Sequence, residues 1–227
     1  VPGVTIAAGN QDVGGAGGLI VVSPPCRVAA GVFDDLTRYG KIAALVASNA
    51  FHYLGIPEWK TRFPDAAVFA PAQSVARVAK RTALSGVRPL ADAKSVAGER
   101  VVLVDMPHYK TGEVLVRITT PRGLVWYVTD IIMNLRVLPS NPVIRAMFRV
   151  SGSGPGLRFN NIALLFMVAD KKALRRWLAD ELRKAAEKLG LTDRQARSQM
   201  QKSLQQAAEN ARPGLEELAK RLEEAAE

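Results

Sequence analysis

The chain has 227 residues, of which 48% are hydrophobic, enough for one large domain or for one domain with a small appendage. No apolar run reaches the roughly 18–20 residues that cross a bilayer, so we do not expect a membrane span. The single cysteine, Cys26, excludes an intramolecular disulfide, and its place in "SPPCR" predicts a small buried residue. The chain begins at Val1 rather than methionine, which leaves the removal of a leader open, and we expect a cytoplasmic location.

The net charge is +10, from 31 Lys and Arg against 21 Asp and Glu, which favours anionic partners through long-range attraction. The basic residues are scattered, with short clusters at 80–81, 171–172 and 175–176, and no aromatic-interleaved basic motif accompanies them. We therefore expect a solvated basic surface that suits an anionic small molecule, and no specific nucleic-acid face.

The first 130 residues alternate short apolar runs with amphipathic segments, a rhythm typical of an α/β fold. The patterns predict strands at 18–24, 41–48 and 66–71, and helices at 27–40, 56–64 and 72–84. Further strands are predicted at 100–106, 113–120 and 123–130. The turn residues "PRG" between the last two predict an antiparallel hairpin.

The C-terminal part changes character. The Gly and Ser content of residues 140–160 predicts a flexible connection, and the chain from Asn161 onward is expected to be helical. This divides the chain into a core, 1–160, and a helical C-terminal region, 161–227. Apolar stripes at Leu174, Trp177 and Leu178 and at Leu215, Leu218 and Leu222 favour packing or homo-oligomerisation by these helices. Trp59, Trp126 and Trp177 are expected in the core.

Two segments contain the candidate site residues. In "ALVASNAFHYLGIPEW", residues 44–59, a strand runs into a turn and a helix, which places Asn49 and His52 at the carboxyl end of the strand. Sites of open α/β sheets usually lie there. In "PHYKTGEVLVRITTPRGLVWYVTD", residues 107–130, His108 precedes the hairpin and Asp130 ends its second strand.

Together these segments resemble the metallo-β-lactamase-like superfamily, whose strand-end motif H-x-H-x-D-H is followed by a glycine. His52 and Gly55 match the end of that motif, while Ala47, Asn49 and Phe51 stand at its two early histidines and its aspartate.

In the later segment, His108 matches a ligating histidine, with one extra residue before Gly112, and Asp130 matches the bridging aspartate. The resemblance covers roughly residues 15–135, and its context is similar to a branch of uncharacterised function with degraded ligand motifs. It implies a four-layer αββα sandwich with a metal cleft at one edge between the two sheets, to which the helical pattern of residues 161–227 adds a C-terminal extension.

The family's activity rests on two zinc or iron ions, each needing about three protein ligands. This chain has only two histidines, so the implied ligand set is incomplete. Two alternatives stay open: His52, His108 and Asp130 converge on one weakly bound zinc or iron ion, or the cleft holds no metal and these residues act structurally.

Polar residues next to these positions suit an anionic small molecule, with ordinary structural roles as the alternative; they are Asn49, Tyr53, Tyr109 and Lys110. No catalytic residue is assigned. The sequence thus favours a metallo-β-lactamase-like protein with a degenerate metal site that binds a small molecule or acts as a scaffold. A mononuclear metal-dependent hydrolase of an ester, lactone or phosphoester and a helical-tail interaction protein are the alternatives.

Overall fold

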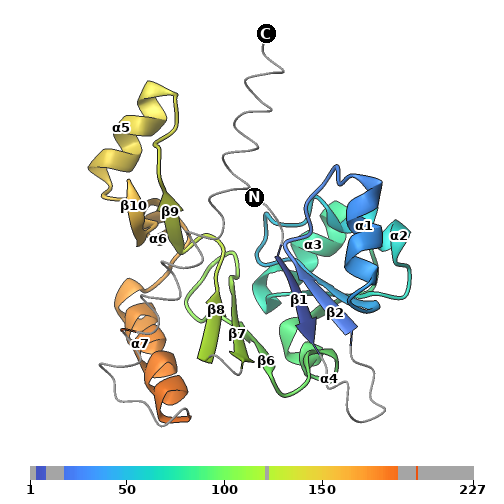
Figure 1. The fold of residues 1–227 in the computed structure, drawn as a ribbon. Coiled ribbons are helices and arrows are strands. Elements are labelled where there is room, and N and C mark those ends of the chain that lie inside the picture. The colour runs from blue at the N-terminus through green and yellow to red at the C-terminus, as the bar shows by residue number, and fades with distance from the viewer. Residues whose placement is uncertain (1–3, 9–17, 121–122, 189–197, 199–227) are drawn as a thin grey trace.

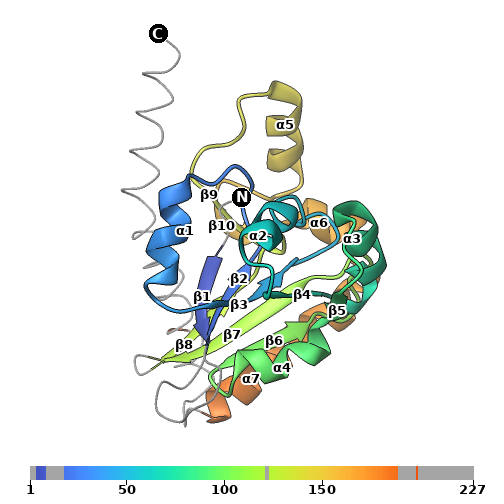
Figure 2. The same cartoon turned by 90° about the vertical axis from the view of Figure 1, so that its right-hand side faces the viewer.

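The structure is a computed structural model that describes residues 4–8, 18–120, 123–188 and 198. Its larger sheet has five strands in the order β1-β2-β3-β4-β5 (Figures 1 and 2). These strands are β1 (Val4–Ala8), β2 (Gly18–Val22), β3 (Ile42–Val46), β4 (Ala67–Ala70) and β5 (Val87–Pro89). β1 is antiparallel to β2, and β2 to β5 are parallel, so their carboxyl ends lie at one edge.

Three helices cover the outer face of this sheet: α1 (Ala30–Thr37), α2 (Ile56–Arg62) and α3 (Val75–Thr82), the last preceded by the 3₁₀ turn η1 (Ala72–Ser74). Side chains alternate along β2, so that Leu19 and Val21 pack with Phe33 and Trp59 under the helices. Ile20 and Val22 face the other way, which explains why β2 is a continuous apolar run.

A second sheet packs against that other face. It is antiparallel and consists of β6 (Val101–Asp105), β7 (Val114–Thr120) and β8 (Gly123–Tyr127). The 3₁₀ turn η2 (Leu90–Ala93) and the helix α4 (Lys94–Ala97) connect the two sheets. Val114 and Val116 of β7 join Val46 and Phe69 in one buried cluster between the sheets.

The remaining elements are β9 (Ile132–Leu135), α5 (Pro142–Val150), β10 (Gly156–Phe159), α6 (Asn161–Phe166) and α7 (Lys171–Lys188). β9 and β10 form an antiparallel pair. Leu164 of α6 and Leu174 of α7 are buried with Met106 and Leu115 on the outer face of the second sheet, and Trp177 packs beside them half-buried. Helices therefore lie outside both sheets in the described part of the chain.

The expectation of a mixed α/β fold is confirmed, as are the predicted strands and helices of the first 130 residues and the β7–β8 hairpin. Residues 140–160, expected as a flexible connection, instead contain α5 and β10. The side chain of Asn141 caps α5 by accepting the N–H groups of Val143 (3.0 Å) and Ile144 (3.2 Å).

The region from Asn161 onward, expected to be helical, contains α6 and α7 in its described part. The helix breaks between α6 and α7, where Val168 forms a β-bridge with Tyr109. α7 then begins with Asp170 accepting the N–H of Ala173 at 2.9 Å. The predicted stripe at 215–222 lies outside the described residues, so oligomerisation through it stays a prediction.

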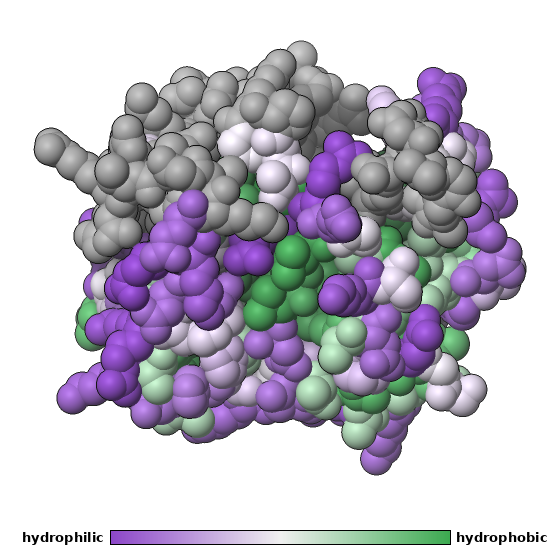
Figure 3. Space-filling model, turned by 90° about the horizontal axis from the view of Figure 1, so that it is seen from below, coloured by the Kyte–Doolittle hydropathy of each residue, from purple (hydrophilic) through white to green (hydrophobic). Residues whose placement is uncertain are grey.

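The surface on the side of α4 and the β7–β8 turn is largely hydrophilic, with apolar side chains gathered in the middle of that face (Figure 3). Among the described residues, no helix combines the length and apolar character needed to cross a membrane.

Leu174 tests whether α7 belongs to the core. Its side chain is fully buried, so Leu174→Ala should lower the free energy of unfolding by about 2–5 kcal/mol, measured by urea denaturation. Arg175→Ala, on the exposed side of the same helix, is the matched control and should change stability by no more than about 0.5 kcal/mol. Equal effects of the two substitutions would show that α7 is not docked as described.

Candidate functional site

The candidate site lies where the ends of strands from both sheets meet. Ser23 follows β2 directly, and residues 47–52 follow β3 at the same edge, because the two strands are parallel. Residues from the second sheet reach this edge as well: Glu113 precedes β7 and Asp130 follows β8.

Backbone hydrogen bonds join the two sheets here. The N–H of Ala50 donates to the carbonyl of Thr111 at 3.0 Å, and the N–H of Val114 donates to the carbonyl of Ser48 at 2.9 Å. The loop after β3 is therefore fixed against the segment that leads into β7.

Asn49 is the centre of the side-chain network and is 1% exposed. Its Nδ2 donates to Glu113 Oε2 at 3.0 Å and to Asp130 Oδ2 at 2.8 Å. Its Oδ1 accepts the N–H of Phe51 at 2.9 Å, which fixes the orientation of the amide. One amide group thus holds two carboxyl groups close together.

Glu113 is fully buried, and its Oε1 accepts the N–H groups of Thr129 (3.0 Å) and Asp130 (3.2 Å) and the Thr129 hydroxyl. Burial raises the pKa of Glu113 to about 7; the hydrogen bonds from Thr129 and Asn49 act against this shift, and the charge of Asp130 adds to it. The group therefore changes charge near neutral pH.

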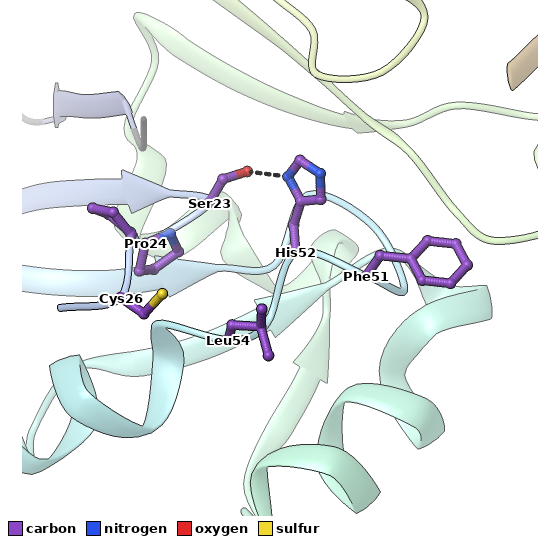
Figure 4. Close-up of a pocket in the computed structure, with 7 residues that line it drawn as sticks. Ser23, Pro24, Cys26, Phe51, His52 and Leu54 are labelled. Carbon is purple, nitrogen blue, oxygen red and sulfur yellow. Dashed lines mark hydrogen bonds between the residues drawn. The ribbon is translucent and has the colours of Figure 1, made fainter. Parts of the chain in front are cut away.

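A chain of polar contacts continues from Asp130. Its Oδ2 lies 3.5 Å from His52 Nε2, and His52 Nδ1 lies 3.1 Å from Ser23 Oγ (Figure 4). Ser23 Oγ is also 2.6 Å from Ser48 Oγ. Burial alone would raise the pKa of Asp130, but the hydrogen bond and charge of His52 and the Asn49 amide hold it below its usual value.

Ser23 has a φ of 52°, in the left-handed region that non-glycine residues rarely adopt. Its N–H donates to the carbonyl of Val46 at 2.8 Å, so the strained residue is held from both its backbone and its hydroxyl. The left-handed conformation of Ser23 ends β2 and turns the chain toward the two prolines that follow.

A pocket of about 290 Å³ opens beside Ser23 and His52. Its lining residues are Ser23, Pro24, Pro25, Cys26, Phe51, His52 and Leu54. Cys26 is exposed here, so the prediction that it is buried is wrong; the two preceding prolines carry it out of the core and into the pocket wall. The walls are mainly apolar, with polar groups supplied by Ser23 and His52.

α2 fixes this pocket in place. Gly55 stands just ahead of α2, where a Cβ atom would lie 2.1 Å from the carbonyl oxygen of Pro24. Trp59, 1% exposed as expected for the core, donates its Nε1–H to the carbonyl of Pro25 at 2.9 Å, and Glu58 accepts the N–H of Arg27 at 2.8 Å. The glycine in the matched motif is thus required by close backbone approach.

The predicted metal ligands are only partly brought together. His52 and Asp130 are in contact, whereas the His108 side chain is exposed on a residue with a φ of 63°. The N–H of Ala173 is the main cause that lowers the pKa of Asp170, and the charge of His108 contributes to the same shift. In the part of the chain that the structure describes, no three His, Cys, Asp or Glu side chains are arranged to hold a metal ion.

The four residues predicted to bind a ligand do not line this pocket. Asn49 lies inside the polar network, and Tyr53 packs half-buried under the helices of the first sheet. Tyr109 is 2% exposed; burial raises the pKa of its phenol, and the charges of Glu113 and Asp130 add to this shift. Lys110 is exposed. A role for these residues in binding stays a prediction.

Sequence reasoning missed Ser23 and Glu113. Ser23 could have been found, since it directly follows a buried parallel strand, whereas a lone glutamate at the start of a strand gives no signal.

Comparisons of the chain with protein-family models, curated proteins and solved structures found no match. Function is therefore inferred from the geometry of the site.

Glu113 should make stability depend on pH. Its pKa of about 7 in the folded protein lies above the ordinary 4.5, so the folded state binds more protons than the unfolded state between these values. The free energy of unfolding should therefore fall as pH rises from about 4.5 to about 7. Asp130, whose pKa is lowered, contributes stability that is lost only as pH falls below its ordinary 3.8.

Urea denaturation across this pH range, on the natural chain and on Glu113→Gln, measures the effect. The difference between the two proteins isolates Glu113, because every other titrating group is common to both. We expect the natural chain to lose stability relative to the variant as pH rises. A difference that stays constant with pH would contradict the assigned shift.

Proposed function

We propose that this chain has a metallo-β-lactamase-like αββα fold in which a hydrogen-bonded polar cluster stands in place of the metal site. We propose further that it acts as a small-molecule-binding or scaffold protein. The order of packing supports the fold: α1–α3, the five-stranded sheet, the three-stranded sheet, and α6–α7. His52 and Asp130, two of the matched motif positions, meet at the edge shared by both sheets, which supports the proposal.

The Asn49 amide is the observation that carries the proposal. Its NH₂ group points at Glu113 and Asp130, and an amide nitrogen that donates protons is no metal ligand. Its Oδ1 accepts a backbone N–H instead. Ala47 and Phe51 supply no ligand atoms from their side chains, so the donor set does not fit a dinuclear centre.

The pocket supports a ligand with an apolar body and an anionic head. Pro24, Pro25 and Leu54 offer apolar walls, and Ser23 and His52, which are also within hydrogen-bond distance of each other, form the polar end of the pocket. The Arg77 guanidinium lies 5.0 Å from the centroid of the Phe51 ring and adds positive charge near the pocket wall. The net charge of +10 would attract such a ligand over longer distances.

The metal-dependent hydrolase alternative predicts a measurable activity. The chain would turn over an ester, lactone or phosphoester only with added zinc or iron, and Asp130→Ala would abolish this turnover. The interaction-protein alternative and the cytoplasmic location stay predictions.

Decanoate, an anion with an apolar chain, is a suitable probe in isothermal titration calorimetry. Leu54 lines the pocket and is 68% exposed, so Leu54→Asp should remove an apolar contact, repel the anion and weaken binding about tenfold or more. Val32→Asp is the matched control, because Val32 is an exposed aliphatic residue on α1 outside the pocket lining.

Binding to the natural chain that survives Val32→Asp and is weakened by Leu54→Asp would support the proposal. Equal weakening by both substitutions would show non-specific attraction of the anion, and absence of binding to the natural chain would contradict the predicted ligand class.

A further inference from the structure

Residues 131–169, here called the α5 segment, have an unusual charge composition. They contain no Asp, Glu or Lys, and four arginines, at 136, 145, 149 and 158. The segment includes β9, α5, β10 and α6. All of its charged side chains are therefore positive.

α5 presents apolar side chains to the surface. None of its residues is buried, and Val143, Met147 and Val150, spaced four and three residues apart, are 75%, 45% and 90% exposed. At 100° per residue these three share one side of the helix, while Arg145 and Arg149 lie on the other. α5 thus has an apolar side without a partner in the described structure.

Neighbouring positions carry further exposed apolar side chains. The other exposed large hydrophobics of the segment are Val137 (82%), Ile144 (40%), Phe159 (42%), Leu165 (58%) and Phe166 (68%). The side chain of Asn161, at the start of α6, donates to the carbonyl of Ser151, at the end of α5, at 2.7 Å. The Asn161 N–H donates to Ser153 Oγ at 3.1 Å, so α5 and α6 are joined as one unit.

Exposed hydrophobic side chains are concentrated in the α5 segment. Eight of the thirteen exposed large hydrophobic side chains in the described residues belong to the α5 segment, more than an even spread over the surface would give. Figures 1 and 2 show α5 projecting beyond both sheets at one end of the molecule. The face seen in Figure 3, on the side away from α5, has a separate group of apolar side chains surrounded by hydrophilic ones.

We propose that the α5 segment is a peripheral docking surface for anionic lipid bilayers, with α5 lying in the plane of the membrane interface. The exposed aliphatic and aromatic side chains would enter the boundary between headgroups and acyl chains. The arginines, with no acidic residue between them, would attract the negative headgroups. At nine residues, about 13 Å, α5 is long enough to lie in the interface and too short to span it.

Lipid fits this surface better than other anionic partners do. A nucleic acid would pair with the arginines but leave the Val, Met and Phe side chains exposed to water. An acidic protein groove could receive a single helix, but the apolar residues here are spread over α5, β10, α6 and a loop on a projecting surface. A bilayer interface adapts to such a surface. The proposal is independent of the ligand pocket beside Ser23.

Co-sedimentation with vesicles of equal parts phosphatidylglycerol and phosphatidylcholine, compared with phosphatidylcholine alone, tests the proposal. We expect binding to the anionic vesicles that weakens with added salt. Val143→Ser with Met147→Ser and Val150→Ser should abolish it, and Arg149→Glu should reduce the partition coefficient about tenfold or more. Val32→Ser with Tyr39→Ser, exposed residues at α1, is the matched control and should bind like the natural chain.

Because α5 contributes no buried residue, its variants should keep the thermal unfolding transition of the natural chain. Met147→Trp gives a second readout: its fluorescence should shift to shorter wavelength on adding anionic vesicles, as the indole enters the interface. Failure to bind anionic vesicles, or binding retained by the triple α5 variant, would overturn the proposal. So would an oligomer, formed without vesicles, that the triple variant dissociates, because the patch would then be a protein interface.

Discussion

The fold at the candidate site depends on one buried amide. Asn49, on the loop after β3, donates to Glu113 ahead of β7 and to Asp130 after β8, so a single side chain joins the two sheets at this edge. Two carboxyl groups held on one amide repel each other when both are charged, and burial adds to that cost. Burial and the charge of Asp130 raise the pKa of Glu113, whereas the hydrogen bond and charge of His52, together with the Asn49 amide, lower the pKa of Asp130.

The network also determines what the pocket can offer. Asp130 fixes one nitrogen of His52, and Ser23 approaches the other, so the imidazole reaches the pocket already oriented. The walls beyond it are rigid because α2 is fastened to the Pro24–Pro25 backbone through Gly55 and Trp59. Pre-organised polar groups at one end of an apolar pocket favour binding of a ligand in one orientation. The network thus links the polar cluster to the proposed binding function.

Local sequence patterns were sufficient to predict the elements whose formation depends on residues close together in the chain. The apolar runs of β2 and β3 and the turn before β8 predicted their strands, and the resemblance to the metallo-β-lactamase-like superfamily predicted that His52 and Asp130 would meet. Contacts distant in sequence could not be predicted. The pairing of Tyr109 with Val168 carries His108 toward α7 and lies between α6 and α7, and nothing near either residue signals it. α5 was missed although Asn141 and Pro142 form an ordinary helix start, because the Gly and Ser residues that follow dominated the interpretation.

Elemental analysis of zinc tests the proposal that the Asn49 network stands in place of a metal site. The natural chain, dialysed after exposure to zinc, is compared with the variant Ala47→His, Asn49→His and Phe51→Asp, which introduces the H-x-H-x-D-H pattern of the proposed family ahead of His52. We expect well under one equivalent of zinc in the natural chain and retained zinc in the folded variant, lost again on His52→Ala. Stoichiometric zinc in the natural chain that is lost on His52→Ala or Asp130→Ala would contradict it.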